Sequence, residues 1–419
     1  MQVSTTGVRR PPELSSGIHA KRSIQAQLLG HKRADCDRYD LPRTAEKRGG
    51  PLEMSERLAF VLGTRPEIIK LAPMIRRCES ADISYTVLHT GQHYSDTLDS
   101  VFFDQLELPD PDINLAIGSG SHGKQTGEML IAIERALGDI DPDTVIVQGD
   151  TNSVLAGAMA TGKMDIDLGH VEAGLRSFDR NMPEETNRVV ADHVSDYLFA
   201  PTEQSKQHLL DEAIDESRIT VTGNTVVDAV HRNVEIARKK SDVLSELGLE
   251  RNRFLLMTAH RAENVDDEDR FREILRGIHR SAFEHDLEVI YPVHPRAQER
   301  IESFGIEVPS RIRRIEPQEY LDFLRLESAA ELIVTDSGGV QEEACILGVP
   351  CVTVRDSTER PETIEAGANR LCPPEASGIE RGISEMLTVR PMWENPIGDG
   401  TATEQIISEL VSTPEPIFQ

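Results

Sequence analysis

The stretch LAFVLGTRPEIIKLAPMIRR, residues 58–77, joins a run of apolar residues to a segment with helical periodicity. Residues 58–62 are all hydrophobic, as in a strand that is buried on both faces of a parallel sheet. Gly63 permits a tight turn, and Pro66 suits the start of a helix. The apolar residues on one face of this helix are Ile68, Leu71, Ala72 and Ile75. The stretch therefore predicts a strand, a turn and a helix in succession.

The same alternation continues along the chain. Further apolar runs predict strands at residues 85–88, 144–147, 167–171, 197–200, 219–222, 254–257, 287–291, 313–315, 332–334 and 351–354. Strands that alternate with helices are typical of right-handed βαβ units in parallel sheets. A long polar helical stretch near residues 228–250 separates two such series. The sequence thus predicts an α/β protein with two doubly wound domains, residues 54–230 and 231–395, and a C-terminal helix and tail over residues 396–419.

Residues 1–53 have a different composition, with 10 Lys and Arg against 6 Asp and Glu and no regular apolar period. We expect a disordered tail or a start codon assigned too far upstream, with a basic interaction arm as the alternative. No apolar region follows the basic residues as it would in a signal peptide.

The whole chain is strongly acidic, with a net charge of −27. Such a charge repels itself at low salt and is screened at high salt, which predicts a salt-adapted protein. It also opposes nucleic-acid binding, which needs a basic surface. No apolar run has the length of a membrane span, and the 5 cysteines form no C-x-x-C pair. We therefore expect a cytoplasmic protein without a metal site and without membrane partners.

Ligands of doubly wound sheets bind beyond the carboxyl ends of the strands, so the residues that follow each strand are the site candidates. Arg65 and Lys70 lie at the start of the first helix and favour an anion there. The alternative is an ordinary turn with solvated basic residues. The segment lacks the glycine patterns of dinucleotide and ATP loops, so it indicates no nucleotide cofactor of either kind.

Carboxylates follow two later strands of the first series. Asp150 and Glu172 both come at strand ends, and Glu184 and Arg188 follow shortly after. Carboxylates that converge beside cations can act as a general base and a general acid. The alternative is structural: Asp150 would cap the next helix, and Glu184 would pair with Arg188 at the i,i+4 spacing.

Histidines take the corresponding positions in the second series. His260, followed by Arg261, comes directly after a strand and suits a diphosphate, although a buried structural histidine is the alternative. His294 repeats this placement less specifically.

A Gly-rich turn follows the strand at residues 332–334. Ser337, Gly338 and Gly339 at a helix start allow backbone N–H groups to approach phosphate. Glu343 lies one turn further, where a carboxylate can accept hydrogen bonds from a ribose diol.

Taken together, these clusters resemble the non-hydrolysing UDP-N-acetylglucosamine 2-epimerases. The matching stretches, in chain order, are GTRPEIIKLAP (63–73), TGQH (90–93), VQGDT (147–151), HVEAGLRS (170–177), PEETNR (183–188), TGNTVVD (222–228), TAHRAEN (258–264), DSGGVQEEA (336–344) and RDSTERPE (355–362). The resemblance covers nearly all of the chain from Met54 onward. It implies two Rossmann-like domains that face a central cleft, as in GT-B glycosyltransferases, and a homodimer.

The resemblance also implies the chemistry: reversible conversion of UDP-GlcNAc to UDP-ManNAc by UDP elimination and re-addition through 2-acetamidoglucal, with no cofactor. The family pattern gives catalytic roles to Asp150, Glu172, Glu184 and His260. It gives substrate-binding roles to Arg65, Lys70, Arg188, Ser337, Gly338, Gly339 and Glu343.

Bacterial members often bind a second UDP-GlcNAc as an activator, and the candidate residues here are Gln92, His93 and His294. The chain departs from that pattern at Tyr94 and Ser95, where other polar residues are common. Relatives with the same core motifs act on UDP-2,3-diacetamido sugar acids. A GT-B glycosyltransferase, a hydrolysing epimerase and a catalytically silent nucleotide-sugar sensor are the competing hypotheses.

Overall fold

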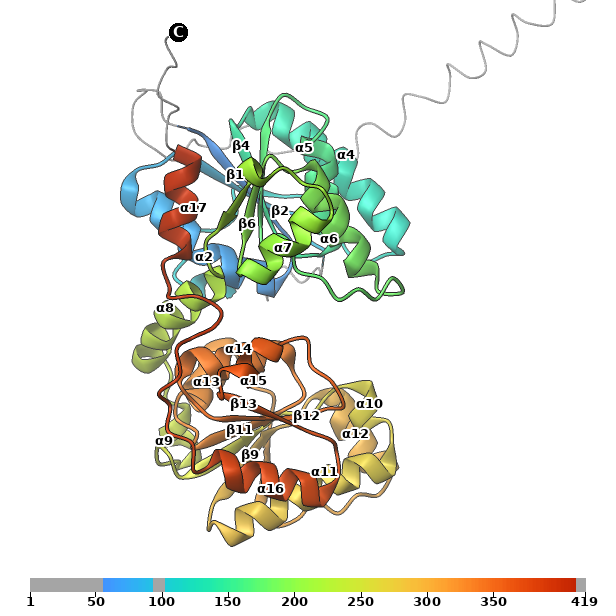
Figure 1. The fold of residues 1–419 in the computed structure, drawn as a ribbon, viewed down its shortest axis with the longest axis vertical. Coiled ribbons are helices and arrows are strands. Elements are labelled where there is room, and N and C mark those ends of the chain that lie inside the picture. Colours follow the sequence, from blue (N-terminus) through green and yellow to red (C-terminus); the bar gives the residue numbers. More distant parts are fainter. Residues whose placement is uncertain (1–55, 93–101, 412–419) are drawn as a thin grey trace, which may run out of the picture. The chain divides into compact units, whose positions relative to one another are not determined.

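The structure is a computed structural model that describes residues 56–92 and 102–411. In this part of the chain the first domain contains a seven-stranded sheet (Figure 1). Its strands are β1 (Leu58–Leu62), β2 (Tyr85–His89), β3 (Ile113–Asn114), β4 (Thr144–Gln148), β5 (Asp167–Val171), β6 (Tyr197–Ala200) and β7 (Ile219–Val221). Its helices are α2 (Arg65–Ala81), α4 (His122–Ile140), α5 (Asn152–Thr161), α6 (Pro183–Val194) and α7 (Glu203–Asp211), with a 3-10 turn η1 (Glu216–Arg218).

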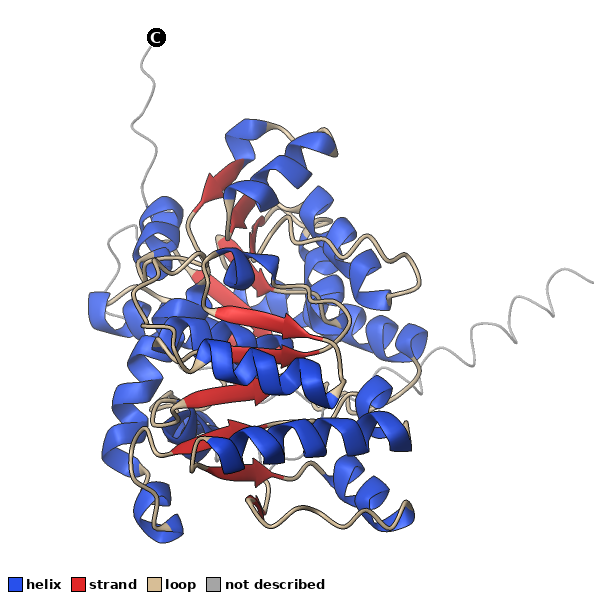
Figure 2. Ribbon diagram, turned by 60° about the horizontal axis from the view of Figure 1, so that its bottom comes forward, coloured by secondary structure: helices blue, strands red, loops and turns tan. Residues whose placement is uncertain are grey.

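The second domain contains a six-stranded sheet. Its strands are β8 (Phe254–Met257), β9 (Glu288–Pro292), β10 (Ile312–Ile315), β11 (Leu332–Thr335), β12 (Cys351–Val354) and β13 (Asn369–Cys372). Its helices are α9 (Val243–Leu247), α10 (Ala262–Val265), α11 (Glu268–Glu284), α12 (Pro295–Ser303), α13 (Tyr320–Glu327), α14 (Gly338–Leu347), α15 (Pro361–Glu365) and α16 (Ala376–Met386). Figure 2 shows helices flanking the strands of both sheets.

Both sheets have the same parallel topology. The spatial order is β3-β2-β1-β4-β5-β6-β7 in the first and β10-β9-β8-β11-β12-β13 in the second. Each is a doubly wound arrangement in which the strand order reverses beside the first strand, between β1 and β4 and between β8 and β11. Ligands bind such sheets at this switch point. The predicted α/β class with two Rossmann-like doubly wound domains is confirmed.

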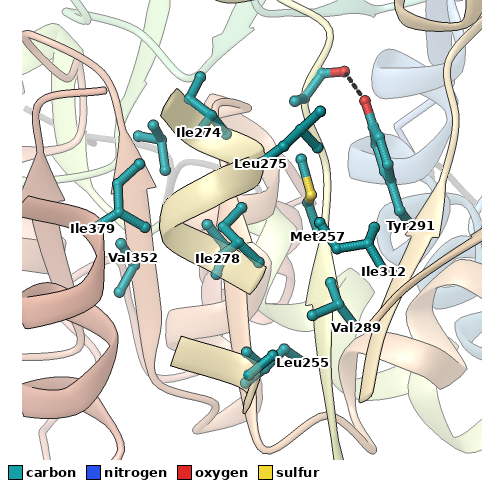
Figure 3. Packing of buried hydrophobic residues seen from close by; sticks show 14 of the residues in the cluster. Leu255, Met257, Ile274, Leu275, Ile278, Val289, Tyr291, Ile312, Val352 and Ile379 are labelled. Atoms are coloured by element: carbon teal, nitrogen blue, oxygen red, sulfur yellow. Dashed lines mark hydrogen bonds between the residues drawn. The ribbon is translucent and has the colours of Figure 1, made fainter. Parts of the chain in front are cut away.

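The hydrophobic patterns account for the elements. Every residue of β1 is buried, as its continuous apolar run predicts. In the second domain, Met257 of β8, Val289 of β9 and Ile278 of α11 belong to one buried cluster (Figure 3). Tyr291 is also fully buried there, and its hydroxyl donates to the Ala259 carbonyl at 3.0 Å, so its polar atom is satisfied.

Helix α8 (Thr225–Lys240) and the last helix of the described residues lie outside this regular alternation. The polar stretch predicted at residues 228–250 corresponds to α8 and α9. Helix α8 packs against both α2 and α13. The last helix, α17 (Ala402–Val411), packs against α2 of the first domain (Figure 1). Arg77 of α2 forms an ion pair with Glu404 of α17 at 2.8 Å. The C-terminal segment therefore returns to the first domain.

Strands β3 and β13 were not predicted, since β3 has two residues and β13 contains the polar residues Asn369 and Arg370. The tail predicted at residues 1–53 lies outside the described residues. Within residues 56–92 and 102–411, no helix is both long and apolar enough to span a membrane. The same residues contain no group of His, Cys, Asp and Glu arranged to hold a metal ion.

Candidate functional site

The loops after β1 and β4 are tied together by a buried carboxylate, Glu67 of α2. Its oxygens accept hydrogen bonds from the Gly63 N–H at 2.9 Å and from the Thr151 hydroxyl at 2.6 Å. Burial raises the pKa of Glu67 to about 7, although these hydrogen bonds oppose the shift. Thr151 also caps α5 by accepting from the N–H groups of Ser153 and Val154. The structural alternative for Asp150 is therefore wrong, because its neighbour caps the helix.

Arg65 and Lys70, the two basic residues predicted near the start of α2, have different surroundings. Arg65 is exposed at the N-terminus of α2, with its guanidinium 5.5 Å from the centre of the Phe102 ring. Lys70, one turn further, is largely buried, and its Nζ donates to Glu172 Oε1 at 2.6 Å. Arg65 is thus accessible to an anion, whereas Lys70 already has a carboxylate partner.

Glu172 follows β5 and is buried among donors. Besides Lys70, the amides of Gln148 and Asn224 donate to its carboxylate, the latter at 2.6 Å. Burial alone would raise the pKa of Glu172, but Lys70 and Asn224 outweigh it and lower the pKa below its usual value. Glu172 also has a positive φ of 70°. A buried, ionised carboxylate on a strained turn is typical of a functional position.

Asp150 and Arg188 are brought together, whereas Glu184 is not part of their contact. Arg188 of α6 forms an ion pair with Asp150 and a second with Glu185 at 2.9 Å. The predicted structural alternative, a Glu184–Arg188 pair, is therefore wrong, because the guanidinium reaches across to the β4 loop instead. Asn187 fixes the same loop by donating to the Asp150 carbonyl at 2.8 Å. Asp150 keeps part of its side chain accessible, as a proton-transfer group needs.

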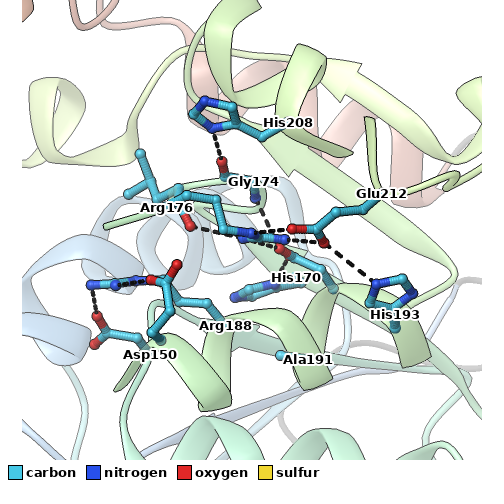
Figure 4. Close-up of polar contacts among 12 residues, drawn as sticks. Asp150, His170, Gly174, Arg176, Arg188, Ala191, His193, His208 and Glu212 are labelled. Carbon is cyan, nitrogen blue, oxygen red and sulfur yellow. Dashed lines mark hydrogen bonds and ion pairs between the residues drawn. The ribbon is translucent and has the colours of Figure 1, made fainter. Parts of the chain in front are cut away.

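Beneath these carboxylates lies a buried polar network (Figure 4). His170 of β5 contacts Asp192 of α6 at 2.7 Å, and Arg176 contacts the other Asp192 oxygen at 2.7 Å. Arg176 also pairs with Glu212 at 2.8 Å. Asp192 additionally accepts from the Gly174 N–H at 3.1 Å. The turn that carries Glu172 is therefore attached to α6 through one carboxylate.

Gly174 is required at this turn. It has a φ of 79°, and a Cβ would lie 2.2 Å from the Ser205 carbonyl oxygen. We expect Gly174→Ala to lower the free energy of unfolding by at least about 2 kcal/mol, through backbone strain and steric overlap. Urea denaturation measures the change. Gly127→Ala in α4, where a Cβ meets no atom within 4 Å, is the control and should stabilise by about 0.5–1 kcal/mol. Equal effects of the two substitutions would contradict this account.

In the second domain, His260 follows β8 and lies half-exposed against Asp336, which follows β11. Its Nδ1 lies 3.0 Å from Asp336 Oδ1, and Asp336 also accepts from the backbone N–H groups of His260 and Arg261 at 3.0 Å each. Asp336 is thereby fixed and orients the imidazole through its Nδ1. The His294 ring centre lies 5.6 Å from that of His260, so the two predicted histidines are neighbours.

The Gly-rich turn after β11 opens α14 as predicted. Ser337 is its N-cap residue, and the Ser337 N–H donates to the Thr335 hydroxyl at 3.0 Å. Of the predicted phosphate donors, the Ser337 N–H is therefore already engaged. Gly338 and Gly339 are the first residues of the helix, and a Cβ at either would meet nothing within 4 Å. Their N–H groups, in the first turn of the helix, lack intrahelical partners, as an anion site requires.

Glu343 of α14 faces a second acid. It interacts electrostatically with Glu327, the last residue of α13, whose side chain is fully buried. Burial raises the pKa of both groups, and their mutual repulsion raises it further for Glu327. Burial therefore favours the neutral form of both carboxyl groups.

Gln92 is turned inward. Its side-chain oxygen accepts from the Ser153 hydroxyl at 2.8 Å, so this amide holds the β4 loop. Its predicted companion His93 lies outside the described residues.

Several functional neighbours were not predicted individually. Glu67, Gln148, His170, Glu185, Asn224 and Asp336 all lie inside the sequence motifs, which was the available signal. Asp192 and Glu327 lie outside every motif, and their only distinguishing feature is a charged side chain within an amphipathic helix.

Comparisons with known proteins identify the family of the chain. A family profile described as UDP-N-acetylglucosamine 2-epimerase matches residues 76–411. A relative named UDP-N-acetylglucosamine 2-epimerase, from Methanocaldococcus jannaschii, is 52% identical over 361 residues, covering 84% of this chain and 98% of the relative. A UDP-2,3-diacetamido-2,3-dideoxy-D-glucuronate 2-epimerase from Pseudomonas aeruginosa is 39% identical over 318 residues, covering 75% of this chain and 88% of the relative.

Among solved structures, the M. jannaschii UDP-GlcNAc 2-epimerase in complex with UDP-GlcNAc and UDP is similar to this chain with a TM-score of 0.74 and 51% identity. The match covers 85% of this chain and 100% of the chain in the solved structure. The profile spans most of the chain, and the match to the M. jannaschii enzyme covers nearly the whole of that enzyme in both comparisons. The chain therefore belongs to the UDP-N-acetylglucosamine 2-epimerase family.

Proposed function

We propose that this protein interconverts UDP-N-acetylglucosamine and UDP-N-acetylmannosamine by reversible epimerisation at sugar C2. The observation that carries the proposal is the pair of carboxylates at the ends of β4 and β5, Asp150 and Glu172, each in contact with a cation, Arg188 or Lys70. Such groups can remove a proton from a carbon atom and return one to it without a redox cofactor. Membership of the UDP-N-acetylglucosamine 2-epimerase family indicates that the substrate is a sugar nucleotide.

The proposed reaction proceeds by elimination and re-addition. A carboxylate takes the proton from C2, the C1–O bond to UDP breaks, and the electron pair of the C2–H bond forms the double bond of 2-acetamidoglucal. UDP then adds back to C1 while C2 accepts a proton on the opposite face. Because no carbonyl activates the C2–H bond, stabilisation of the departing diphosphate must supply much of the rate enhancement.

The chain offers donors for that diphosphate. We assign Arg65, His260 and the N–H groups of Gly338 and Gly339 to the phosphate oxygens, with Ser337 beside them. Arg65 is exposed, and a Cβ at Gly338 or Gly339 would meet no atom within 4 Å, which supports this assignment. Glu343 would accept hydrogen bonds from the ribose diol.

We assign the proton-handling roles to Asp150, Glu172 and Glu184, with Lys70 and Arg188 controlling their charge. The lowered pKa of Glu172 supports a base that is ionised at neutral pH. Because burial would otherwise raise this pKa, removal of Lys70 would return Glu172 towards its protonated form. Glu184 sits in the first turn of α6, where the helix dipole favours a carboxylate.

A second substrate is a 2,3-diacetamido sugar acid linked to UDP, since the Pseudomonas aeruginosa relative carries that name. The chemistry at C2 would be the same. The discriminating measurement is kcat/KM on both sugar nucleotides, and we expect UDP-GlcNAc to be preferred because the identity to the UDP-GlcNAc enzyme is higher.

The setting of the enzyme is also a proposal. We infer a cytoplasmic homodimer that supplies UDP-ManNAc for polysaccharide biosynthesis, since nucleotide sugars are activated donors. An allosteric UDP-GlcNAc site at Gln92, His93 and His294 is less supported, because Gln92 is engaged with Ser153 and His294 adjoins His260.

The net charge of −27 leads to a salt prediction. We expect the melting temperature to rise between low and molar KCl, because screening relieves repulsion within the fold. The KM for the sugar nucleotide should increase at the highest salt, because Arg65 attracts the diphosphate less when screened. Melting curves and kinetics over one KCl series measure both, with uncharged sorbitol at equal osmolality as the control. A melting temperature that does not change with KCl would refute salt adaptation.

The product formed from UDP-GlcNAc without any acceptor tests the proposed function. An epimerase yields UDP-ManNAc and approaches the same mixture from either epimer. Free ManNAc with UDP would indicate a hydrolysing enzyme instead. No change under conditions where UDP binds would indicate a transferase that lacks its acceptor, or a sensor.

A further inference from the structure

His170 lies beneath the proposed catalytic loops and has no assigned role. Its ring is fully buried on β5. Nδ1 lies 2.7 Å from an Asp192 oxygen, and Nε2 lies 2.9 Å from the carbonyl oxygen of Gly149. The histidine therefore bridges α6 and the loop that carries Asp150.

Both partners of the ring are acceptors. A carbonyl oxygen can only accept, so Nε2 must carry a proton. Asp192 also accepts from Arg176 at 2.7 Å and from the Gly174 N–H at 3.1 Å, so its carboxylate is ionised and Nδ1 must carry a proton too. A histidine with protons on both nitrogens is an imidazolium.

The charges around the ring favour that form. Asp192 of α6 is in contact, and Glu172, which follows β5, contributes at longer range. The cation Arg176 contacts the other oxygen of Asp192 and is itself paired with Glu212, which follows α7. Burial opposes the charge, but the two carboxylates outweigh burial and raise the pKa of His170.

We propose that His170 is a buried imidazolium at neutral pH that positions Asp150 and Glu172 for proton transfer. It holds the Gly149 carbonyl, one peptide unit before Asp150, at a glycine with a φ of 84°. Through Asp192 it also holds the Gly174 N–H, two residues after Glu172. One ion pair thus fixes both loops, and this role rests on the proposed function of the two carboxylates.

Fixing the loops affects the reaction rather than nucleotide binding. The phosphate donors assigned above come from other elements, so loosening the Gly149 carbonyl should leave UDP affinity nearly unchanged. A displacement of a catalytic group by about 1 Å can cost about 100-fold in rate. His170 therefore acts as a positioning residue.

The first test is the protonation state of His170 in the full chain. Proton-nitrogen NMR with 15N-histidine reports both ring nitrogens between pH 6 and pH 9. The control is His208, whose Nδ1 faces the Gly174 carbonyl at 2.9 Å and whose Nε2 faces the Gln204 amide nitrogen at 3.0 Å, so only one of its ring nitrogens faces a carbonyl or carboxylate acceptor. We expect His170 to carry protons on both ring nitrogens at pH 7. A neutral His170 ring at pH 7 would overturn the proposal.

The second test uses His170→Asn, whose amide can still reach Asp192 but cannot reach Gly149. We expect kcat to fall about 100-fold while UDP affinity, measured by calorimetry, stays within about 2-fold. His208→Gln, the control, should leave both within about 2-fold. In the wild type kcat should fall as pH rises through the folded-state pKa of His170, and this fall should be absent from His170→Asn. A variant with unchanged kcat, or one that loses UDP binding in parallel, would overturn the positioning role.

If the wild-type chain lacks epimerase activity, the proposed function is refuted but the structural role of His170 is not. Amide hydrogen exchange then tests whether His170 fixes the loop, because releasing the Gly149 carbonyl should speed exchange in residues 149–151 in His170→Asn but not in His208→Gln. Unchanged exchange in that segment would contradict it.

Discussion

Asp150→Asn is expected to abolish epimerisation, with kcat reduced by about 10²–10⁴-fold, because the amide cannot take or return a proton. UDP affinity should stay within about 2-fold, since Asp150 is assigned no phosphate contact. The fold should tolerate the change because Thr151, and not Asp150, caps α5. Steady-state kinetics and calorimetry with UDP separate the two effects.

The control is Asp167→Asn, the same substitution at the opposite end of β5 from Glu172. It should leave kcat within about 2-fold. Near-normal turnover of Asp150→Asn would show that this carboxylate serves only to hold Arg188, and the proton-transfer role would have to pass to Glu172 and Glu184.

Replacing Asp192 with Leu should produce the largest loss of stability. The substitution leaves His170 and Arg176 as two buried cations and removes the acceptor of the Gly174 N–H. Breaking a buried ion pair in this way costs about 3–5 kcal/mol, so the variant is expected to be marginally folded or unfolded. Urea denaturation and the yield of folded protein measure the effect.

An exposed ion pair provides the matched control. Glu235→Leu breaks the pair with Arg238, where about half of each side chain is accessible, and should change stability by less than about 1 kcal/mol. Similar losses from both substitutions would mean that the buried network contributes no more than a surface pair, and the account of Asp192 would be wrong.

Acid should weaken the same network. Burial would raise the pKa of Asp192, but His170 and Arg176 outweigh it, so its folded-state pKa lies below its unfolded value. The stability it contributes is therefore present above the unfolded pKa and is lost as pH falls through the folded pKa. For His170 the sign is opposite, since its raised pKa means that its contribution is lost as pH rises.

Much of the fold could be predicted because its strands are continuous apolar runs. Every residue in 58–62 and in 254–257 is buried. Continuous apolar runs, rather than alternating apolar and polar residues, are typical of strands in parallel sheets. Strand β13 was missed because its sequence, NRLC, contains two polar residues and has no apolar run. Strand β3 has two residues, which no periodicity can reveal.

The candidate site was predictable where polar residues follow strands directly, as Asp150 and His260 do. Pairing was less predictable. Helix spacing alone offers Glu184 as a partner of Arg188. The Arg188 guanidinium instead contacts Asp150, 38 residues away in the sequence. Asp192 and Glu327 are buried acids on amphipathic helices, and only tertiary packing reveals that their partners are His170 and Glu343.

Epimerisation of UDP-GlcNAc in D2O, followed by proton NMR, tests the central claim most directly. If a carboxylate removes the C2 proton and solvent supplies its replacement, each UDP-ManNAc molecule should carry deuterium at C2, and the H2 signal of recovered UDP-GlcNAc should fade at the rate of turnover. Asp150→Asn should show neither change. Formation of UDP-ManNAc that retains its original C2 proton would contradict proton transfer at C2 and with it the proposed roles of Asp150, Glu172 and His170.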